Sequence, residues 1–167
     1  MAHASTAAPD APFLDSAGKT LRTKDILSGA GGLPVLLAFF KVNCPTCQLT
    51  WPYLQKLNAL YGGRAVRVAG VCQNDASAGK KYYKEFGGAT FDLFVDPEPK
   101  FVASNAFGVE AVPHLVLVSS DGRVTRVSEG WSKKEIEELG RTVAAEKKLT
   151  PRPVVEASDP VREFQAG

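Results

Sequence analysis

Two of the three cysteines in this 167-residue chain are separated by two residues, in the run Cys44-Pro45-Thr46-Cys47. A thiol is a nucleophile only when it is ionised, and a free cysteine with a pKa of about 8.5 is mostly protonated at neutral pH. Two thiols one helical turn apart lie close enough to form a disulfide. The spacing predicts either a redox-active dithiol or half of a metal site.

The residues around this run predict where the two sulfurs lie. Residues 35–40 are apolar without alternation, as in a strand covered on both faces, and residues 44–61 have helical periodicity. Cys44 then stands at the helix N-cap, where unpaired N–H groups and the helix dipole favour its thiolate, and Pro45 suits the first helical position. We expect Cys44 to attack a disulfide and Cys47, the more buried sulfur, to release the product.

The rest of the chain alternates predicted strands and helices. These elements predict an α/β fold: a three-layer sandwich with a mixed central sheet flanked by helices. In chain order they are a hairpin over Phe13–Leu21, helix Lys24–Ser28, strand Ala65–Cys72, helix Ser77–Phe86, strand Phe91–Val95, a helix beginning at Pro97 with Asp96 as N-cap and ending at Gly108, strands Leu115–Val118 and Val124–Val127, and a last helix opened by Ser132-Lys133-Lys134-Glu135.

Composition and charge narrow the classes of protein. With 44% hydrophobic and 23% charged residues, the chain can form a core, and its length suits one domain. We expect a flexible N-terminal arm over 1–11, the domain over 12–148 and a loosely held, proline-containing tail over 149–167. Twenty Lys and Arg against eighteen Asp and Glu give a net charge of +2, too weak a field to indicate nucleic acid.

The sequence also allows expectations about the cellular location and the oligomeric state of the protein. The longest apolar run, residues 33–40, is much shorter than the roughly 20 residues that span a bilayer, so we expect no membrane span. Residues 1–10 lack the features of a secretory signal, which favours the cytoplasm. A periplasmic or other extracytoplasmic location stays open if a signal or anchor has been removed. Nothing in the sequence requires more than a monomer.

Several of these motifs together resemble the thioredoxin superfamily. The apolar strand 35–40, the Cys44–Cys47 motif, Pro52 five residues after the second cysteine, and Val112-Pro113 before a strand are similar to that superfamily's strand, redox motif, kinked helix and cis-proline. The N-terminal hairpin and the additional strand and helix resemble the TlpA/ResA-like or AhpC/TSA-like (redoxin) branch. The similarity covers about residues 10 to 147.

The resemblance implies a thiol–disulfide oxidoreductase. It makes Cys44 the attacking thiol, Cys47 the resolving thiol and Pro113 a cis-proline, which would turn the Val112 backbone outward to pair with an extended substrate. The expected substrates are protein or small-molecule disulfides and dithiols, with an unidentified electron donor and no cofactor beyond the cysteine pair. The expected substrate groove consists of Pro45, Thr46, Val112 and Pro113.

Other positions depart from the superfamily's pattern or are candidates for tuning. The superfamily's proton-shuttling carboxylates are replaced by Ala38 and Thr50. Lys41 is placed to lower the pKa of Cys44. His114, after the expected cis-proline, is a candidate for contacting substrate, and Cys72 ends a strand at the side where sites assemble in parallel α/β sheets.

Two alternatives come from other classes. A thiol peroxidase of AhpC/TSA type uses a Pro-x-x-x-Thr/Ser-x-x-Cys loop, and no cysteine here has those residues seven and three positions before it. A non-catalytic thioredoxin-like module that holds Cu(I) between its thiolates stays open. No second pair with zinc spacing is present, so we predict no resident metal.

Overall fold

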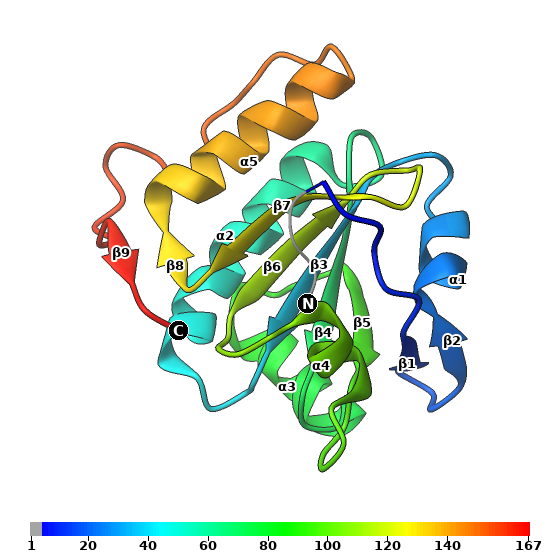
Figure 1. The fold of residues 1–167 in the computed structure, drawn as a ribbon. Coiled ribbons are helices and arrows are strands. Elements are labelled where there is room, and N and C mark those ends of the chain that lie inside the picture. Colours follow the sequence, from blue (N-terminus) through cyan, green and yellow to red (C-terminus); the bar gives the residue numbers. More distant parts are fainter. Residues whose placement is uncertain (1–4) are drawn as a thin grey trace.

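A seven-stranded mixed sheet forms the centre of the protein in the computed structural model, which describes residues 5–167 (Figure 1). A two-stranded sheet, β8–β9, lies beside it. The elements in chain order are β1 (Pro12–Asp15), β2 (Thr20–Arg22), α1 (Thr23–Ser28), β3 (Val35–Phe40), α2 (Pro45–Tyr61), β4 (Arg67–Cys72), α3 (Ala76–Glu85), β5 (Asp92–Val95), α4 (Val102–Phe107), β6 (His114–Val118), β7 (Val124–Glu129), β8 (Trp131–Ser132), α5 (Lys133–Glu146) and β9 (Phe164–Gln165).

The order and direction of the strands explain why the candidate reactive residues lie at one end of the sheet. The order is β2-β1-β5-β4-β3-β6-β7, with β3, β4 and β5 parallel to one another. Strand β6 runs antiparallel to β3, so that His114 at its beginning pairs with Phe39 near the end of β3. The carboxyl ends of β3 and β4 therefore meet the amino end of β6. This arrangement confirms the predicted α/β sandwich with a mixed sheet and an N-terminal hairpin.

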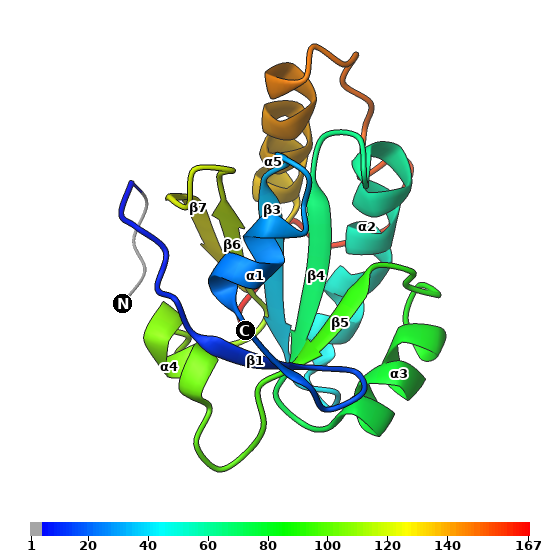
Figure 2. The same ribbon diagram turned by 90° about the vertical axis from the view of Figure 1, so that its right-hand side faces the viewer.

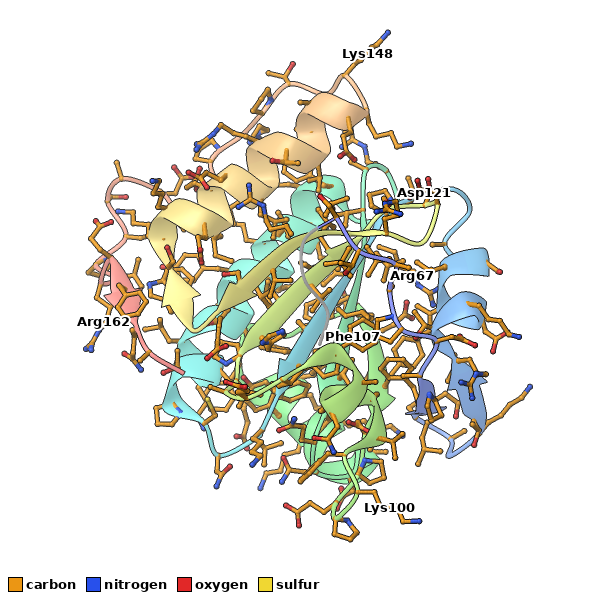
Figure 3. The ribbon with its side chains drawn as sticks, in the orientation of Figure 1. Arg67, Lys100, Phe107, Asp121, Lys148 and Arg162 are labelled. Carbon is orange, nitrogen blue, oxygen red and sulfur yellow. The ribbon has the colours of Figure 1, made fainter. Side chains whose placement is uncertain are left out.

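Both faces of the sheet are buried. Because side chains alternate along a strand, β3 contributes to two cores at once. Helices α2, α3 and α5 cover one face, and α1 and α4 cover the other (Figure 2). The β3 residues toward α2 are Leu36, Ala38 and Phe40, and those toward α4 are Val35, Leu37 and Phe39. Phe107 of α4 is fully buried, whereas Lys100 and Lys148 project outward (Figure 3).

Two adjacent tyrosines of α3 pack on the α2 side of the sheet. The Tyr83 hydroxyl donates a hydrogen bond to the Asp92 carbonyl at 2.9 Å. It occupies the space beside Gly70, where a Cβ would lie 2.1 Å from the hydroxyl oxygen. The Tyr82 ring packs on Phe40, with centroids 4.6 Å apart, and among the described residues its buried hydroxyl has no hydrogen-bond partner.

Helix α4 begins later than the sequence predicts. Asp96 does act as a cap, but from a distance: its carboxylate accepts hydrogen bonds from the N–H groups of Ala103, at 3.1 Å, and Ser104, at 2.6 Å. The N-cap position itself is Phe101, with a left-handed backbone (φ 43°). The intervening residues 97–101 form a turn rather than the first turn of a helix. The predicted helix start at Pro97 was therefore wrong, because an acidic residue can cap a helix across a loop.

Both ends of the chain are held to the domain, which corrects the expectation of loosely held arms. At the N-terminal end, the Ala8 N–H donates to the Gly122 carbonyl before β7 and the Thr6 carbonyl accepts from the Val124 N–H, while residues 1–4 lie outside the described part. At the C-terminal end, Val154 and Val155 are buried in the core beneath α2 and α5. The polar, proline-rich composition of residues 149–167 concealed this apolar pair.

The two tyrosines of α3 make a matched stability test. Tyr83→Phe removes a made hydrogen bond and is expected to lower the free energy of unfolding by about 1 kcal/mol. Tyr82→Phe removes a buried hydroxyl that has no partner, so it should leave that free energy unchanged or raise it. Urea unfolding of both variants measures this, and an equal loss in the two would contradict the assignment.

The distant cap of α4 is tested at Asp96. Asp96→Ala leaves two buried N–H groups without an acceptor and is expected to lower the free energy of unfolding by about 2 kcal/mol. Asp96→Asn keeps one acceptor oxygen and should cost less. The same urea measurement applies, and a loss under 0.5 kcal/mol for Asp96→Ala, on the order of an ordinary surface substitution, would contradict the capping role.

Candidate active site

The Cys44 sulfur lies at the beginning of α2, where β3 has just ended. Cys44 is the N-cap residue, and its sulfur accepts a hydrogen bond from the Cys47 N–H at 3.1 Å. Pro45, which has no N–H to satisfy, takes the first helical position. The Cys44 N–H donates to the Lys41 carbonyl, which fixes the loop before the helix. The predicted N-cap position of Cys44 is confirmed.

The surroundings of Cys44 favour its thiolate. They lower its pKa to about 6, chiefly through a hydrogen bond with the Cys47 side chain and then through the N–H groups of Cys47 and Thr46. The positive charge of Lys41 adds a smaller effect in the same direction, as the sequence predicted, while partial burial opposes it. Cys44 is therefore mostly ionised at neutral pH.

Cys47 differs from Cys44 in both its burial and the direction in which its pKa is shifted. Its side chain is fully buried beneath the first turn of α2, and burial raises the pKa of its thiol well above the ordinary range, as does the neighbouring Cys44. Ala38 and Thr50, where the superfamily has acidic groups, offer no carboxylate, and the Thr50 hydroxyl donates to the Thr46 carbonyl at 2.7 Å. The pair thus combines a partly exposed thiolate with a buried, protonated thiol.

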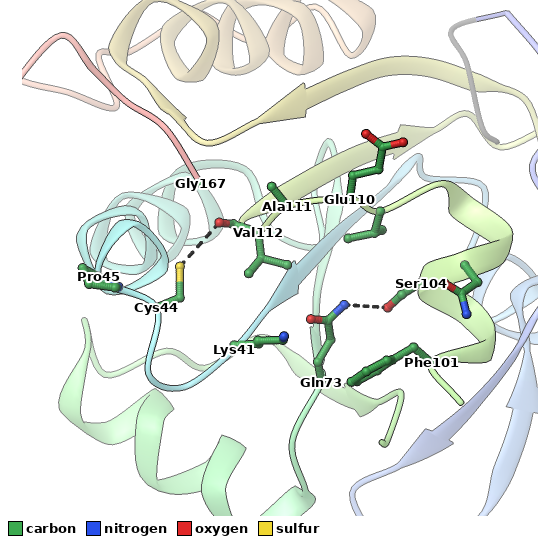
Figure 4. Close-up of a pocket in the computed structure, with 12 residues that line it drawn as sticks. Lys41, Cys44, Pro45, Gln73, Phe101, Ser104, Glu110, Ala111, Val112 and Gly167 are labelled. Atoms are coloured by element: carbon green, nitrogen blue, oxygen red, sulfur yellow. Dashed lines mark hydrogen bonds between the residues drawn. The ribbon is translucent and has the colours of Figure 1, made fainter. Parts of the chain in front are cut away.

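The segment before β6 faces Cys44. The Val112–Pro113 peptide bond is cis, as the resemblance to the thioredoxin superfamily implied. The Cys44 thiol lies 3.4 Å from the Val112 carbonyl oxygen, to which it donates when it is protonated (Figure 4). The antiparallel pairing of β6 with β3 brings this segment to the end of β3 where Cys44 follows. A backbone acceptor therefore stands directly beside the reactive sulfur.

A cavity of about 500 Å³ opens beside Cys44 on the side of α4. Lys41 lies over the Phe101 ring, 5.6 Å from its centroid, and the buried Gln73 amide donates to the Ser104 hydroxyl at 2.9 Å (Figure 4). A disulfide of low molecular weight could reach the Cys44 sulfur through this cavity. Its lining consists of Lys41, Cys44, Pro45, Gln73, Phe101, Ser104, Asn105, Val109, Glu110, Ala111, Val112 and Gly167.

Most of this lining was not predicted. Gln73 directly follows Cys72 at the carboxyl end of β4, so its position after a buried strand was the one available signal. Phe101 and Ser104 depend on where α4 begins, which the sequence analysis placed wrongly. Gly167 belongs to a segment that the sequence predicted to be loosely held. These contacts arise between segments far apart in the chain.

Thr46, an expected groove residue, is covered in the structure. Its side chain is 4% exposed, and its hydroxyl donates to the Ala166 carbonyl at 2.6 Å. The same oxygen accepts a hydrogen bond from the Gln165 amide at 2.8 Å. Of the four expected groove residues, Pro45 and Val112 line the cavity, whereas Thr46 lies beneath the C-terminal segment.

Cys72 and His114 are both buried, and the cavity wall beside Cys44 is formed by other residues. Burial raises the pKa of Cys72 to about 11, and its thiol lies near the Asp75 carbonyl. The His114 ring packs edge-on against Phe39, and burial lowers its pKa, which favours the neutral ring. The roles suggested for these two side chains stay predictions, and their surroundings are those of packed core residues.

Within residues 5–167, no cluster of three or more His, Cys, Asp or Glu side chains is arranged to hold a metal ion. In the same part of the chain, no helix combines the length and the apolar character needed to cross a membrane.

The fold and the cysteine pair define a thioredoxin-like dithiol protein, and comparison with known proteins gives its family. The family model described as Redoxin matches residues 3–143. Since this is most of the chain, the protein belongs to the Redoxin family. The predicted resemblance to the redoxin branch of the thioredoxin superfamily is thereby confirmed.

Relatives and solved structures agree with this family. The chain is 27% identical over 128 residues to the thiol-disulfide oxidoreductase ResA of Geobacillus thermodenitrificans, covering 77% of this chain and 70% of that protein. ResA of Bacillus anthracis is 28% identical over the same length, with the same coverage. These relatives support the predicted class of enzyme, a thiol–disulfide oxidoreductase.

Two solved structures show the same fold. A thiol:disulfide interchange protein from a Bacteroides species is similar with a TM-score of 0.70 and 19% identity, over 85% of this chain and 91% of that one. DsbF of Mycobacterium tuberculosis is similar with a TM-score of 0.64 and 26% identity, over 80% and 92%. The three-layer architecture predicted from the sequence is thus that of thioredoxin-like proteins.

The ionisation of Cys44 can be tested by alkylation. We expect the rate with iodoacetamide to rise with pH through a midpoint near 6 and to level off above it, because only the thiolate reacts. Cys47→Ala removes the hydrogen bond that contributes most to the low pKa, so the midpoint should move upward. The measurement is mass-spectrometric alkylation kinetics on the reduced protein.

Cys72→Ala is the control for this experiment, since its thiol is buried and the cavity beside Cys44 is lined by other residues. It should leave the midpoint where it is in the unmodified chain. A midpoint at about 8.5 or above in that chain, the value of a free thiol, would refute the low pKa.

Proposed function

We propose that Cys44 and Cys47 catalyse thiol–disulfide exchange on disulfide substrates, with Cys44 as the attacking thiol and Cys47 as the resolving thiol. The observation that carries this proposal is the contrast between the two sulfurs. Cys44 has a pKa of about 6 and borders an open cavity, whereas Cys47 is buried and held protonated. A pair in which only one sulfur is ionised and accessible has a defined order of attack.

In the first step the Cys44 thiolate attacks one sulfur of a substrate disulfide. A bond forms between Cys44 and that sulfur, the substrate S–S bond breaks, and the other substrate sulfur leaves as a thiolate. The N–H of Cys47 and the Lys41 charge, which stabilise the Cys44 anion, lose that interaction as its charge passes to the leaving sulfur. The product is a mixed disulfide between substrate and protein.

In the second step Cys47 releases the substrate. Once Cys44 is uncharged, the anion that opposed ionisation of Cys47 is gone, so its proton can pass to the departed thiolate or to water. The Cys47 thiolate attacks the Cys44 sulfur, the Cys44–Cys47 disulfide forms, and the second substrate sulfur leaves. Two electrons have moved from the cysteine pair to the substrate, and the reverse sequence donates a disulfide.

The remaining parts of the proposal concern partners. The substrates are disulfides or dithiols, and a dithiol donor returns the oxidised pair to the reduced form. The cysteine pair itself carries the electrons, so no further cofactor takes part. Action as a monomer and a cytoplasmic location stay predictions, to be checked by sedimentation and by fractionation of cells.

The function is tested by reduction of insulin and of 2-hydroxyethyl disulfide with dithiothreitol as donor. The unmodified chain should accelerate at least one of these reactions well beyond dithiothreitol alone. Cys44→Ser should lose the acceleration entirely, because no other thiol borders the cavity. Cys47→Ser should stall after the first step and accumulate a mixed disulfide that mass spectrometry detects.

Cys72→Ser serves as the control, because its thiol lies in the core and neither step of the proposal uses it. It should keep the activity of the unmodified chain. Equal activity in the unmodified chain and in Cys44→Ser on both substrates would overturn the proposed function.

A further inference from the structure

The C-terminal segment 162–167 lies across the first turn of the active-site helix α2. It reaches this position through pairing of β9 with β8, in which Trp131 is opposite Gln165 and Ser132 is opposite Phe164 (Figure 1). The Trp131 indole N–H donates to the Arg162 carbonyl at 2.6 Å, and the Lys133 N–H donates to the Glu163 carbonyl at 2.9 Å. The Trp131 side chain and backbone groups thus hold the segment in place.

The end of this segment covers two of the expected groove residues. Gln165 and Ala166 form hydrogen bonds with the Thr46 hydroxyl, which is why Thr46 is buried. Gly167 lies against the Val112 backbone, where a Cβ on Gly167 would be 2.5 Å from the Val112 carbonyl oxygen. An extended peptide that paired with the Val112 backbone would need the space that Gly167 occupies.

The backbone of Gly130 also lies close to the C-terminal segment. Gly130, between β7 and β8, has a φ of 76°, and a Cβ there would lie 2.8 Å from the Gln165 carbonyl oxygen. Glycine is suited to this position because it tolerates the left-handed conformation and leaves room for the passing chain. The space beside Thr46, Val112 and Gly130, here called the peptide groove, is therefore filled by residues of this chain.

The other side of Cys44 is open. The 500 Å³ cavity runs from the sulfur toward α4, and its polar lining includes Lys41 and Glu110. A low-molecular-weight disulfide can enter there without moving the C-terminal segment, whereas a protein disulfide needs room for the chain on both sides of its cysteine. The two sides of the reactive sulfur thus differ in the size of substrate that they admit.

We propose that segment 162–167 sets substrate specificity by occupying the peptide groove, so that the protein takes low-molecular-weight disulfides in preference to protein disulfides. This inference rests on the proposed function, since it concerns the same Cys44 sulfur. Protein disulfides react only when the segment leaves the groove. Small disulfides react whether the segment is in place or not.

The test is a variant of the whole 167-residue chain in which the segment no longer fits. Gln165→Ala with Gly130→Ala removes one hydrogen bond to Thr46 and places a Cβ 2.8 Å from the Gln165 carbonyl oxygen, so that the segment has to shift. We expect the ratio of insulin reduction to 2-hydroxyethyl disulfide reduction to rise about tenfold, which is about 1.4 kcal/mol. The rate with 2-hydroxyethyl disulfide should stay within about twofold of the unmodified chain.

A matched control and a second variant complete the experiment. Phe164→Ser changes a side chain of the same segment that is 64% exposed, and should leave the ratio unchanged. A chain ending at Glu163 keeps the Lys133 hydrogen bond but lacks the covering residues, and its ratio should rise at least as far as in the double variant. Thermal unfolding of each variant checks that the fold is intact.

The outcomes separate this inference from the proposed function. If the unmodified chain reduces neither substrate faster than Cys44→Ser does, the function itself fails. If the unmodified chain is active but its ratio matches that of both the double variant and the shortened chain within twofold, the specificity inference alone is overturned.

Discussion

The hydrogen bonds that end on the Cys44 sulfur at the beginning of α2 are the interaction on which the chemistry of this protein depends. They keep that sulfur anionic at neutral pH, and the same geometry places Cys47 one turn further along, beneath the helix surface. Burial raises the pKa of the Cys47 thiol. In the proposed function, one helical turn supplies both the nucleophile and the delayed second nucleophile.

The sheet brings the partners of this turn together. Strands β3 and β4 end on the same side of the sheet because they are parallel, and β6 begins on that side because it is antiparallel to β3. Cys44, Gln73 and the Val112–Pro113 segment consequently meet at one end of the sheet, although they are far apart in the chain. The buried Asp96 carboxylate, which caps α4 across a loop, completes the cavity by fixing the position of Ser104.

The two sides of Cys44 are built by different parts of the molecule. The open side is lined mainly by residues of the compact fold, among them Lys41 and residues of α4, together with Gly167. The closed side is made by a segment that follows the last helix and returns to the domain through β8 and β9. Val154 and Val155 anchor this return in the core, so the closure depends on the whole C-terminal extension rather than on its end alone.

The sequence by itself determined the class of fold, the place of Cys44 at a helix N-cap and the more deeply buried position of Cys47, because each depends on spacing or on residue type within a short stretch. The cis bond at Pro113 was implied by the resemblance to the thioredoxin superfamily. The sequence misplaced the start of α4, since the Asp96 carboxylate reaches its partners across a loop. The cavity beside Cys44 and the covering of Thr46 by Ala166 were decided by tertiary structure alone. Both arise from contacts between segments far apart in the chain, such as Gln73 with Ser104 and Thr46 with Ala166, and the local pattern of residue types does not indicate such contacts.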